Sequence, residues 1–348
     1  MYKLKQIPED FIVEEIANLK LVPKGKFLIY EMKKKDCNTV HAIEQLAKHL
    51  KVPLKFIGFA GSKDRHAVTT QFISVKKARP NFQFLLDQFS SDLISLDLIG
   101  EADEPLSLGD LETNRFVITV RNLTDDDTNK IQSFKPDQIE NYFDEQRFSE
   151  KNPLIGIEVL KGNFKEVCDL CDEYCCRDHL KKQSKDFVGA FKRIPMKIRL
   201  MYIHAFQSLL FNRALQQLTE EQTKNPTLTK YSFGTFAFST QDTITEQNLP
   251  LIGFASEFET GKINELFTSY LKEYDITLRD FAIRSIPALS CEGDLRPAYF
   301  KVSGFEYELM DDDLNSDKKK IVLKFILPKG SYATIVIKKI FGQLIKSK

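Results

Sequence analysis

A loop between two apolar runs holds the residues best suited to chemistry. The stretch GFAGSKDRHAVTTQ (58–71) places Lys63, Asp64, Arg65 and His66 in a row. Neighbouring cations keep a carboxylate ionised, which suits a nucleophile or a general base. The alternative is that Asp64 only caps a turn, and composition alone favours it because structural ion pairs are common. The loop lacks the P-loop pattern and the chain lacks G-x-G-x-x-G, so we expect neither a nucleotide site nor a Rossmann cofactor site.

A second segment, NYFDEQRFS (141–149), mixes aromatic rings with Asn, Gln and Arg. Such rings can stack on a base, and the polar side chains beside them can bind bases or phosphates. The segment is therefore consistent with a nucleic-acid surface. It is equally consistent with a helix end that buries Phe143 and Phe148.

Four cysteines, Cys168, Cys171, Cys175 and Cys176, lie close to His179. The spacing of the first three predicts one face of a single helix. Zinc needs four ligands that converge tetrahedrally, and one straight helix cannot supply them. We therefore expect buried thiols and no metal site.

Charge is unevenly distributed along the chain, although its net value is only +1. Residues 1–80 carry +8, residues 81–145 carry −11 and residues 146–230 carry +5. Such asymmetry allows local positive faces, with solubility as the alternative explanation. The segment 177–199 is a candidate phosphate-contact stripe or, equally, a solvated helix face; its basic residues are Arg177, Lys181, Lys182, Lys185, Lys192, Arg193, Lys197 and Arg199. The acidic runs 125–127 and 311–313 are expected to be exposed turns.

Length and composition indicate a folded protein of two domains, or one core with a large insertion. The chain has 348 residues, of which 42% are hydrophobic and 28% charged. No apolar run approaches the roughly 18 residues of a membrane span, and the N-terminus does not resemble a signal peptide. Six cysteines in a chain of this length do not form a disulfide scaffold, so we expect a cytoplasmic protein.

Hydrophobic periodicity outlines the elements that must position these residues. Runs at 11–16 and 27–32, separated by the turn at 23–25, predict a β-hairpin. The remaining expected elements are a helix at 39–50, strands at 56–60, 68–75 and 116–120, helices across 155–220, strands at 299–309 and 321–327, and a helix from 333. The order of strands, helices and strands predicts an α+β core whose two halves enclose an inserted helical domain.

Six motifs, in matching order over nearly the whole chain, resemble those of the TruD family of tRNA pseudouridine synthases. They are IPEDFIVEE (7–15), FAGSKDRHAVTTQ (59–71), NRFVITVRN (114–122), NYFDEQRFS (141–149), YIHAFQSLLFN (202–212) and LPKGSYATIVIKKI (327–340). Lys5 matches a functional lysine of the family, and CNT (37–39) matches as well. The chain departs from the family pattern at Asp144 and Ser149, which replace glycines, and at Lys338, which replaces an arginine.

The resemblance implies an α+β fold: a pseudouridine synthase core with a mixed, mainly antiparallel sheet and flanking helices, joined to an inserted α/β domain. It places the core at 1–154 and 297–348 and the insertion at 155–296. It also implies a V-shaped molecule with an RNA-binding cleft between the two domains, lined in part by the basic segment 177–199. No feature predicts a dimer, so we expect a monomer.

The implied activity is the cofactor-free isomerisation of a uridine in tRNA to pseudouridine, and uridine 13 is the position that we expect. Asp64 would be the essential carboxylate and Lys5 its partner, while Phe143 would stack on the flipped base and Asn141 would hold that segment. Further expected RNA contacts are Lys63, Arg65, Gln146, Arg147, Lys192, Arg193 and Lys197. His66 could assist proton transfer or only pack, and we expect it to pack. The alternatives are a non-catalytic RNA-binding protein or tRNA chaperone of the same fold, a synthase for another RNA position, or another RNA-modifying enzyme such as a methyltransferase.

Overall fold

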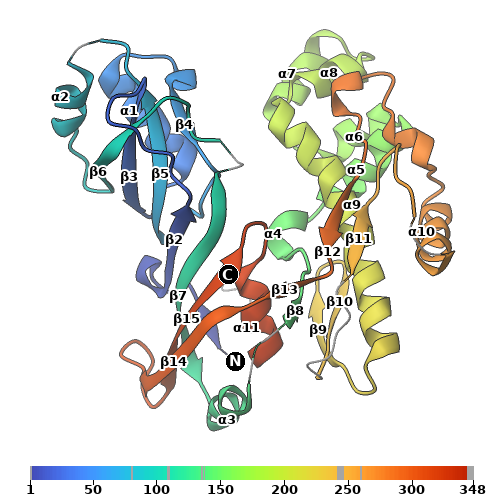
Figure 1. Ribbon diagram of the computed structural model, residues 1–348. Helices are drawn as coiled ribbons and strands as arrows, with labels where there is room; N and C mark the ends of the chain where they lie inside the picture. Colours follow the sequence, from blue (N-terminus) through green and yellow to red (C-terminus); the bar gives the residue numbers. More distant parts are fainter. Residues whose placement is uncertain are drawn as a thin grey trace. The chain divides into compact units, whose positions relative to one another are not determined.

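The computed structural model describes residues 2–79, 81–107, 110–134, 136, 138–240, 247–258 and 261–342. The chain forms two compact units, one built mainly from Met1–Asp137 and Lys301–Ala333 and the other from Gln138–Phe300 and Thr334–Gln343 (Figure 1). These limits differ from those of the expected domains, because residues 138–154 and the last helix pack with the second unit.

The first unit is organised around one sheet. Within the described residues it has nine strands, in the order β14-β15-β7-β2-β5-β3-β6, with β1 paired to β7 and β4 paired to β5. The strands are β1 (Lys3–Leu4), β2 (Phe11–Ala17), β3 (Phe27–Lys35), β4 (Ile57–Phe59), β5 (Val68–Lys76), β6 (Ile94–Ala102), β7 (Leu111–Leu123), β14 (Ser303–Asp311) and β15 (Lys319–Pro328). Among these described strands, β2 and β5 are the only neighbours that run parallel. The expected mixed, mainly antiparallel sheet is thus confirmed.

Helix α1 (Thr39–Leu50) covers part of this sheet. It begins where the Asn38 side chain accepts a hydrogen bond from the amide of His41, at 2.7 Å. Its apolar face, which includes Ile43 and Leu46, packs on inward-facing side chains of β3 and β5 such as Tyr30. The expected helix at 39–50 is confirmed. The other helical elements of this unit are η1 (Pro8–Asp10), η2 (Leu54–Phe56), α2 (Phe82–Asp87) and α3 (Asp125–Ser133).

The predicted hairpin between the runs at 11–16 and 27–32 is wrong. Strand β5 lies between β2 and β3 and pairs with both of them. The intervening turn is held by β6, because Val22 bridges to Glu101 and the amide of Gly25 donates to the Glu101 carboxylate at 2.6 Å. A turn signal shows that the chain reverses, but not whether another strand enters the gap.

The second unit is mainly helical. Its helices are α4 (Glu145–Phe148), α5 (Asn152–Lys161), α6 (Phe164–Leu170), α7 (Tyr174–Lys182), α8 (Phe187–Arg193), α9 (Met196–Gln222), α10 (Gly261–Glu273), η3 (Leu278–Phe281), η4 (Pro287–Leu289) and α11 (Ala333–Phe341). Its strands pair as β9 (Thr227–Tyr231) with β10 (Gly234–Phe238), β11 (Asn248–Leu251) with β12 (Asp294–Pro297), and β8 (Gln138–Glu140) with β13 (Tyr299–Lys301). The expected helical stretch is confirmed, and its long helix is α9.

Close packing of α5 on α9 forms the centre of this unit. A Cβ atom at Gly156 would lie 2.3 Å from the carbonyl oxygen of Tyr202, so only glycine permits this approach. The core side of α9 buries Phe206, Leu210 and Phe211. Asn212 of the same helix is also buried, at 1% exposure.

The cysteines do not share one helix as the spacing predicted. Helix α6 ends at Leu170 and α7 begins at Tyr174, so Cys168 and Cys176 lie on different helices, with their sulfur atoms 3.3 Å apart. All six cysteines of the chain are free thiols, and Cys171 is buried like these two. Burial raises the pKa of Cys171 to about 12, so its thiol is protonated at neutral pH. The prediction of buried thiols is confirmed for Cys168, Cys171 and Cys176, whereas Cys175 is only partly buried.

Candidate active site

Asp64 lies in the loop that joins β4 to β5, two neighbouring strands of the first unit's sheet. Its carboxylate oxygen Oδ2 is 2.5 Å from Nζ of Lys5, and both side chains are about one-quarter exposed, at 27% and 25%. The Lys5 ammonium also lies 4.0 Å from the centre of the Phe11 ring, a cation–π distance. The pair therefore combines a fixed anion with access from solvent, as a reactive carboxylate requires.

A buried lysine, Lys34, holds the backbone of this loop. Lys34, which is only 1% exposed, donates from Nζ to the carbonyl oxygens of Cys37 at 2.6 Å and Asp64 at 2.8 Å, with that of Lys63 at 3.5 Å. Burial lowers its pKa to about 8 from the ordinary 10.5. An ammonium group with three donors matches three carbonyl acceptors, so Lys34 fixes the backbone that carries Asp64.

Lys63, which we expected to contact RNA, is turned into the protein. Its ammonium lies 3.1 Å from the carboxylate of Glu15, and the two side chains are 8% and 0% exposed. Glu15 also accepts a hydrogen bond from the amide of Phe72 at 2.8 Å. Lys63 thus ties the loop to β2 and β5 in this structure, and its charge is not presented to solvent.

The two residues that follow Asp64 in the loop, Arg65 and His66, are exposed. Arg65 presents its side chain at the surface, as an RNA contact would require. His66, which we expected to pack, instead makes hydrogen bonds: Nε2 lies 3.0 Å from the carbonyl oxygen of Lys5 and Nδ1 lies 3.2 Å from the carboxylate of Asp36. Both partners are acceptors, so the two bonds form together only when the imidazole carries both protons.

A second group of expected site residues lies in the second unit, around Phe143. The backbone of Phe143 is held by Asn212 of α9, whose side chain accepts from its amide at 2.9 Å and donates to its carbonyl at 2.8 Å. The ring is only 6% exposed. The guanidinium carbon of Arg296 lies 4.1 Å from the ring centre, and Phe211 meets the ring edge-on.

Asn141 and Arg296 hold each other beside this ring. Arg296 donates to the Asn141 side-chain oxygen at 2.5 Å, and the Asn141 amide donates to the carbonyl oxygen of Pro297 at 2.9 Å. Arg147 donates to the hydroxyl of Ser208 at 3.1 Å. Sequence reasoning did not find Arg296, because nothing local marks a residue that meets Asn141 from 155 positions away.

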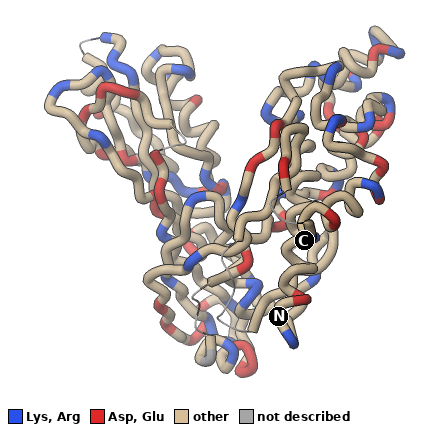
Figure 2. Tube along the Cα trace, turned by 45° about the vertical axis from the view of Figure 1, so that its right-hand side comes forward, with Lys and Arg blue, Asp and Glu red and all other residues tan. Residues whose placement is uncertain are grey.

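The basic segment 177–199 extends over three helices rather than one face. Lys192 and Arg193 end α8 and Lys197 lies in the first turn of α9, and all three are exposed, as is Gln146 of α4. Lys182 instead pairs with Asp178 within α7, at 3.0 Å. Both basic and acidic residues occur along the trace of each unit (Figure 2).

The expected site residues are thus divided between the two units. Asp64, Lys5, Lys63 and Arg65 belong to the first unit. The others belong to the second: Asn141, Phe143, Gln146, Arg147, Lys192, Arg193 and Lys197. Among the described residues, no three His, Cys, Asp or Glu side chains are arranged to bind a metal ion, and no helix is long and apolar enough to span a membrane.

Comparison with known proteins gives the same family over nearly the whole chain. The model of the family tRNA pseudouridine synthase D (TruD) matches residues 2–177 and 171–340. "Probable tRNA pseudouridine synthase D 1" of Methanococcus maripaludis is 31% identical, over 98% of this chain and 100% of its own length. The tRNA pseudouridine synthase D of Aquifex aeolicus is 28% identical, over 99% of each chain.

The fold is similar to that of a solved structure as well. The crystal structure of the TruD protein from Methanosarcina mazei matches with a TM-score of 0.71 and 28% identity, over 97% of this chain and 93% of that one. Family model, relatives and structure agree with the motifs identified in the sequence. The chain belongs to the TruD family of tRNA pseudouridine synthases and is therefore an isomerase.

Proposed function

We propose that Asp64 is the catalytic carboxylate in the conversion of one uridine of tRNA, uridine 13, to pseudouridine. The observation that carries this proposal is the ion pair of Asp64 with Lys5, at 2.5 Å, on a loop that Lys34 holds from below. Lys5 keeps the Asp64 carboxylate anionic at neutral pH. The carboxylate is partly exposed and therefore accessible to a substrate.

The reaction balances within the substrate. The bond from N1 of uracil to C1′ of the ribose breaks, the base turns over, C5 bonds to C1′ and the C5 proton is lost while N1 gains one. No electron leaves the nucleoside, so no redox cofactor is required. Asp64 either adds to the nucleoside or removes the C2′ proton, and both roles need the anion.

The target uridine has to leave its stack before its ribose can be reached. We assign Phe143 as the ring on which the uracil stacks, and Asn141 as the residue that holds its segment. Because Arg296 lies against the Phe143 ring, stacking on that face requires the guanidinium to move. The proposed backbone contacts are Arg65, Gln146, Arg147, Lys192, Arg193 and Lys197, which come from both units; Lys63 is assigned to the loop instead.

We further propose that the enzyme acts as a monomer in the cytoplasm. Free thiols at all six cysteines suit a reducing compartment. The large apolar side chains that are exposed, such as Phe84 and Tyr174, are distributed over different elements rather than gathered on one of them.

The position of the modified uridine is tested with matched tRNA transcripts labelled with tritium at uridine C5. Wild-type enzyme should release tritium from a transcript that carries uridine 13. When that position is cytidine, the amount of tritium released should fall by the share that uridine 13 contributed. Undiminished release from the cytidine-13 transcript would assign the activity to a different uridine.

A further inference from the structure

Lys5 occupies its place with little help from its own strand. Strand β1 contains only Lys3 and Leu4, and Lys5 follows with φ of 54°, a left-handed conformation that is unfavourable for a lysine. A two-residue strand leaves the next side chain weakly fixed. The position of its ammonium at Asp64 must therefore be determined by contacts from elsewhere in the unit.

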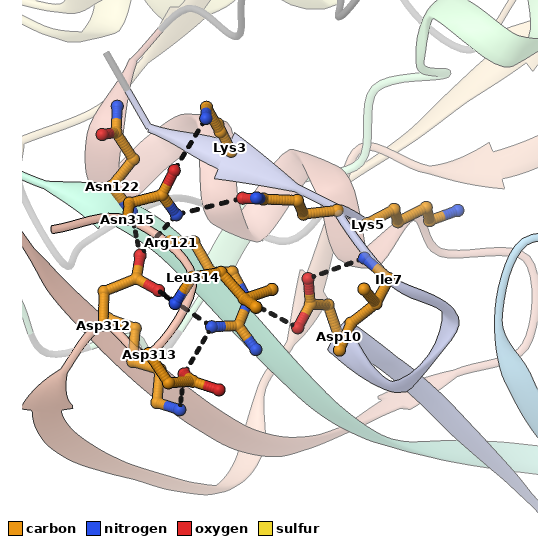
Figure 3. Close-up of polar contacts among 12 residues, drawn as sticks. Lys3, Lys5, Ile7, Asp10, Arg121, Asn122, Asp312, Asp313, Leu314 and Asn315 are labelled. Carbon is orange, nitrogen blue, oxygen red and sulfur yellow. Dashed lines mark hydrogen bonds and ion pairs between the residues drawn. The ribbon is translucent and has the colours of Figure 1, made fainter.

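One such contact comes from the turn between β14 and β15. The side-chain oxygen of Asn315 accepts a hydrogen bond from Nζ of Lys3 at 2.7 Å, and its amide nitrogen donates to the side-chain oxygen of Gln6 at 3.0 Å. Asn315 thus holds residues on both sides of Lys5 (Figure 3). Its own position is fixed by a hydrogen bond to Asp312 at 2.8 Å.

Arg121 anchors the same turn and the other end of the N-terminal segment. It is 4% exposed and lies on β7 opposite Lys3. It donates from Nε to Asp10 at 2.8 Å, and from one terminal nitrogen to Asp312 at 2.9 Å and Asp313 at 2.7 Å. Asp10, only 1% exposed, in turn accepts from the amide of Ile7 at 3.1 Å.

Asp312 completes the network, and its burial corrects the expectation of an exposed acidic turn at 311–313. Its side chain is fully buried, accepts from the amide of Asn122 at 2.8 Å and closes the turn by accepting from the amide of Leu314 at 3.0 Å. The carboxylate thereby ties the turn to β7, as Figure 3 shows. Of the three aspartates, Asp311 and Asp313 remain exposed.

We propose that the Asp312–Asn315 turn, anchored on Arg121, positions Lys5 for its ion pair with Asp64, and that Asn315 is a positioning residue of the reaction. The contacts of the network fall on Lys3, Gln6, Ile7 and Asp10, which flank Lys5. The Lys5 side chain itself contacts Asp64 and the Phe11 ring. This inference rests on the proposed roles of Lys5 and Asp64.

A double-mutant cycle on the full chain tests the proposal. Asn315→Ala should lower kcat for tritium release from tRNA about tenfold and leave KM within about twofold, because displacement of a catalytic group affects the chemical step. In a Lys5→Met background, the same substitution should have almost no further effect. Gln6→Ala removes the hydrogen bond between Asn315 and the exposed Gln6 side chain. It should also lower kcat, but by less than Asn315→Ala does.

Asp311→Ala is the matched control. Asp311 lies in the same hairpin and pairs with Lys319 at 2.6 Å, away from the N-terminal segment, so its loss should leave kcat unchanged. The inference is overturned if Asn315→Ala and Gln6→Ala leave kcat unchanged, or if Asn315→Ala lowers kcat by the same factor with and without Lys5. If Lys5→Met alone has wild-type kcat, the proposed role of Lys5 is wrong, and this inference is wrong with it.

Discussion

Asp144 and Lys338, which both depart from the family pattern, form an ion pair with each other in the second unit. They lie 194 residues apart in the chain, and their side chains are 8% and 4% exposed. Asp144 has an ordinary φ of −90°, so its backbone does not require the glycine of the motif. The aspartate and the lysine thus compensate for each other, and the local turn at α4 is retained.

Loss of one member of this pair should destabilise the second unit. Lys338→Met leaves the Asp144 carboxylate buried without its cation, and we expect the free energy of unfolding to fall by about 3–5 kcal/mol. The double variant Asp144→Gly with Lys338→Met removes both charges and should recover much of that loss. Urea denaturation of the three proteins measures this, and equal stability of the single and double variants would show that the pair does not carry the effect.

Ser149, the other departure, does have a backbone that requires glycine. It ends α4 with φ of 48° and ψ of −147°, a conformation that L-residues rarely adopt. Ser149→Gly should therefore raise the free energy of unfolding, by about 1 kcal/mol. Ser184→Gly, at an exposed loop serine without positive φ, is the control and should lower stability or leave it unchanged. A Ser149→Gly protein no more stable than wild type in urea would refute the strain.

Burial of Lys34 predicts a pH-dependent stability. Its pKa is lowered to about 8, so below that pH the lysine is charged in both folded and unfolded chains and the cost of burying the charge is fully present. Between pH 8 and the ordinary pKa of 10.5 the unfolded chain binds more protons, so folding stability rises with pH. Above that window the lysine is neutral in both states.

Relative to Lys34→Met, the wild-type free energy of unfolding should increase across this window by on the order of 3 kcal/mol. Chemical denaturation of both proteins at pH 7.5 and pH 10 gives the difference. Lys33→Met, at an exposed position on the same strand, should show no such slope relative to wild type. If the difference in free energy of unfolding between wild type and Lys34→Met does not change with pH, Lys34 does not titrate in this range.

Charge reversal on α8 and α9 tests the proposed tRNA contacts of the second unit. Arg193→Glu with Lys197→Glu should weaken tRNA binding and make the dependence of log K on log salt shallower by about two, since about one counterion is released per phosphate contact. Lys272→Glu, at an exposed residue of α10, serves as the control for a general change in charge. If the double variant binds tRNA with unchanged affinity and unchanged salt dependence, Arg193 and Lys197 do not contact the tRNA.

Charged residues in a row between two apolar runs are unusual, so the sequence alone indicated the loop of Asp64 as a candidate site. It could not identify Lys34 as the support of that loop. Lys33, Lys34 and Lys35 are adjacent in sequence, and only the sheet decides that Lys34 points inward. The hairpin prediction failed because β5 enters between β2 and β3.

Long-range partners were beyond reach for the same reason. The contact of Arg121 with Asp312 joins residues 191 positions apart, and local composition indicated only an acidic turn. Burial of such an ion pair depends on which strands become neighbours, here β7 and β15, which hydropathy does not specify.

The most direct test of the account is tritium release from tRNA labelled at uridine C5, with wild type, Asp64→Asn and Asp103→Asn compared without added cofactor. Asp103 is an exposed carboxylate of the same unit and controls for the loss of one charge. The account predicts release by wild type and Asp103→Asn, and none by Asp64→Asn although that variant folds and binds tRNA. Release by Asp64→Asn at the wild-type rate would contradict the assignment of Asp64 as the catalytic carboxylate.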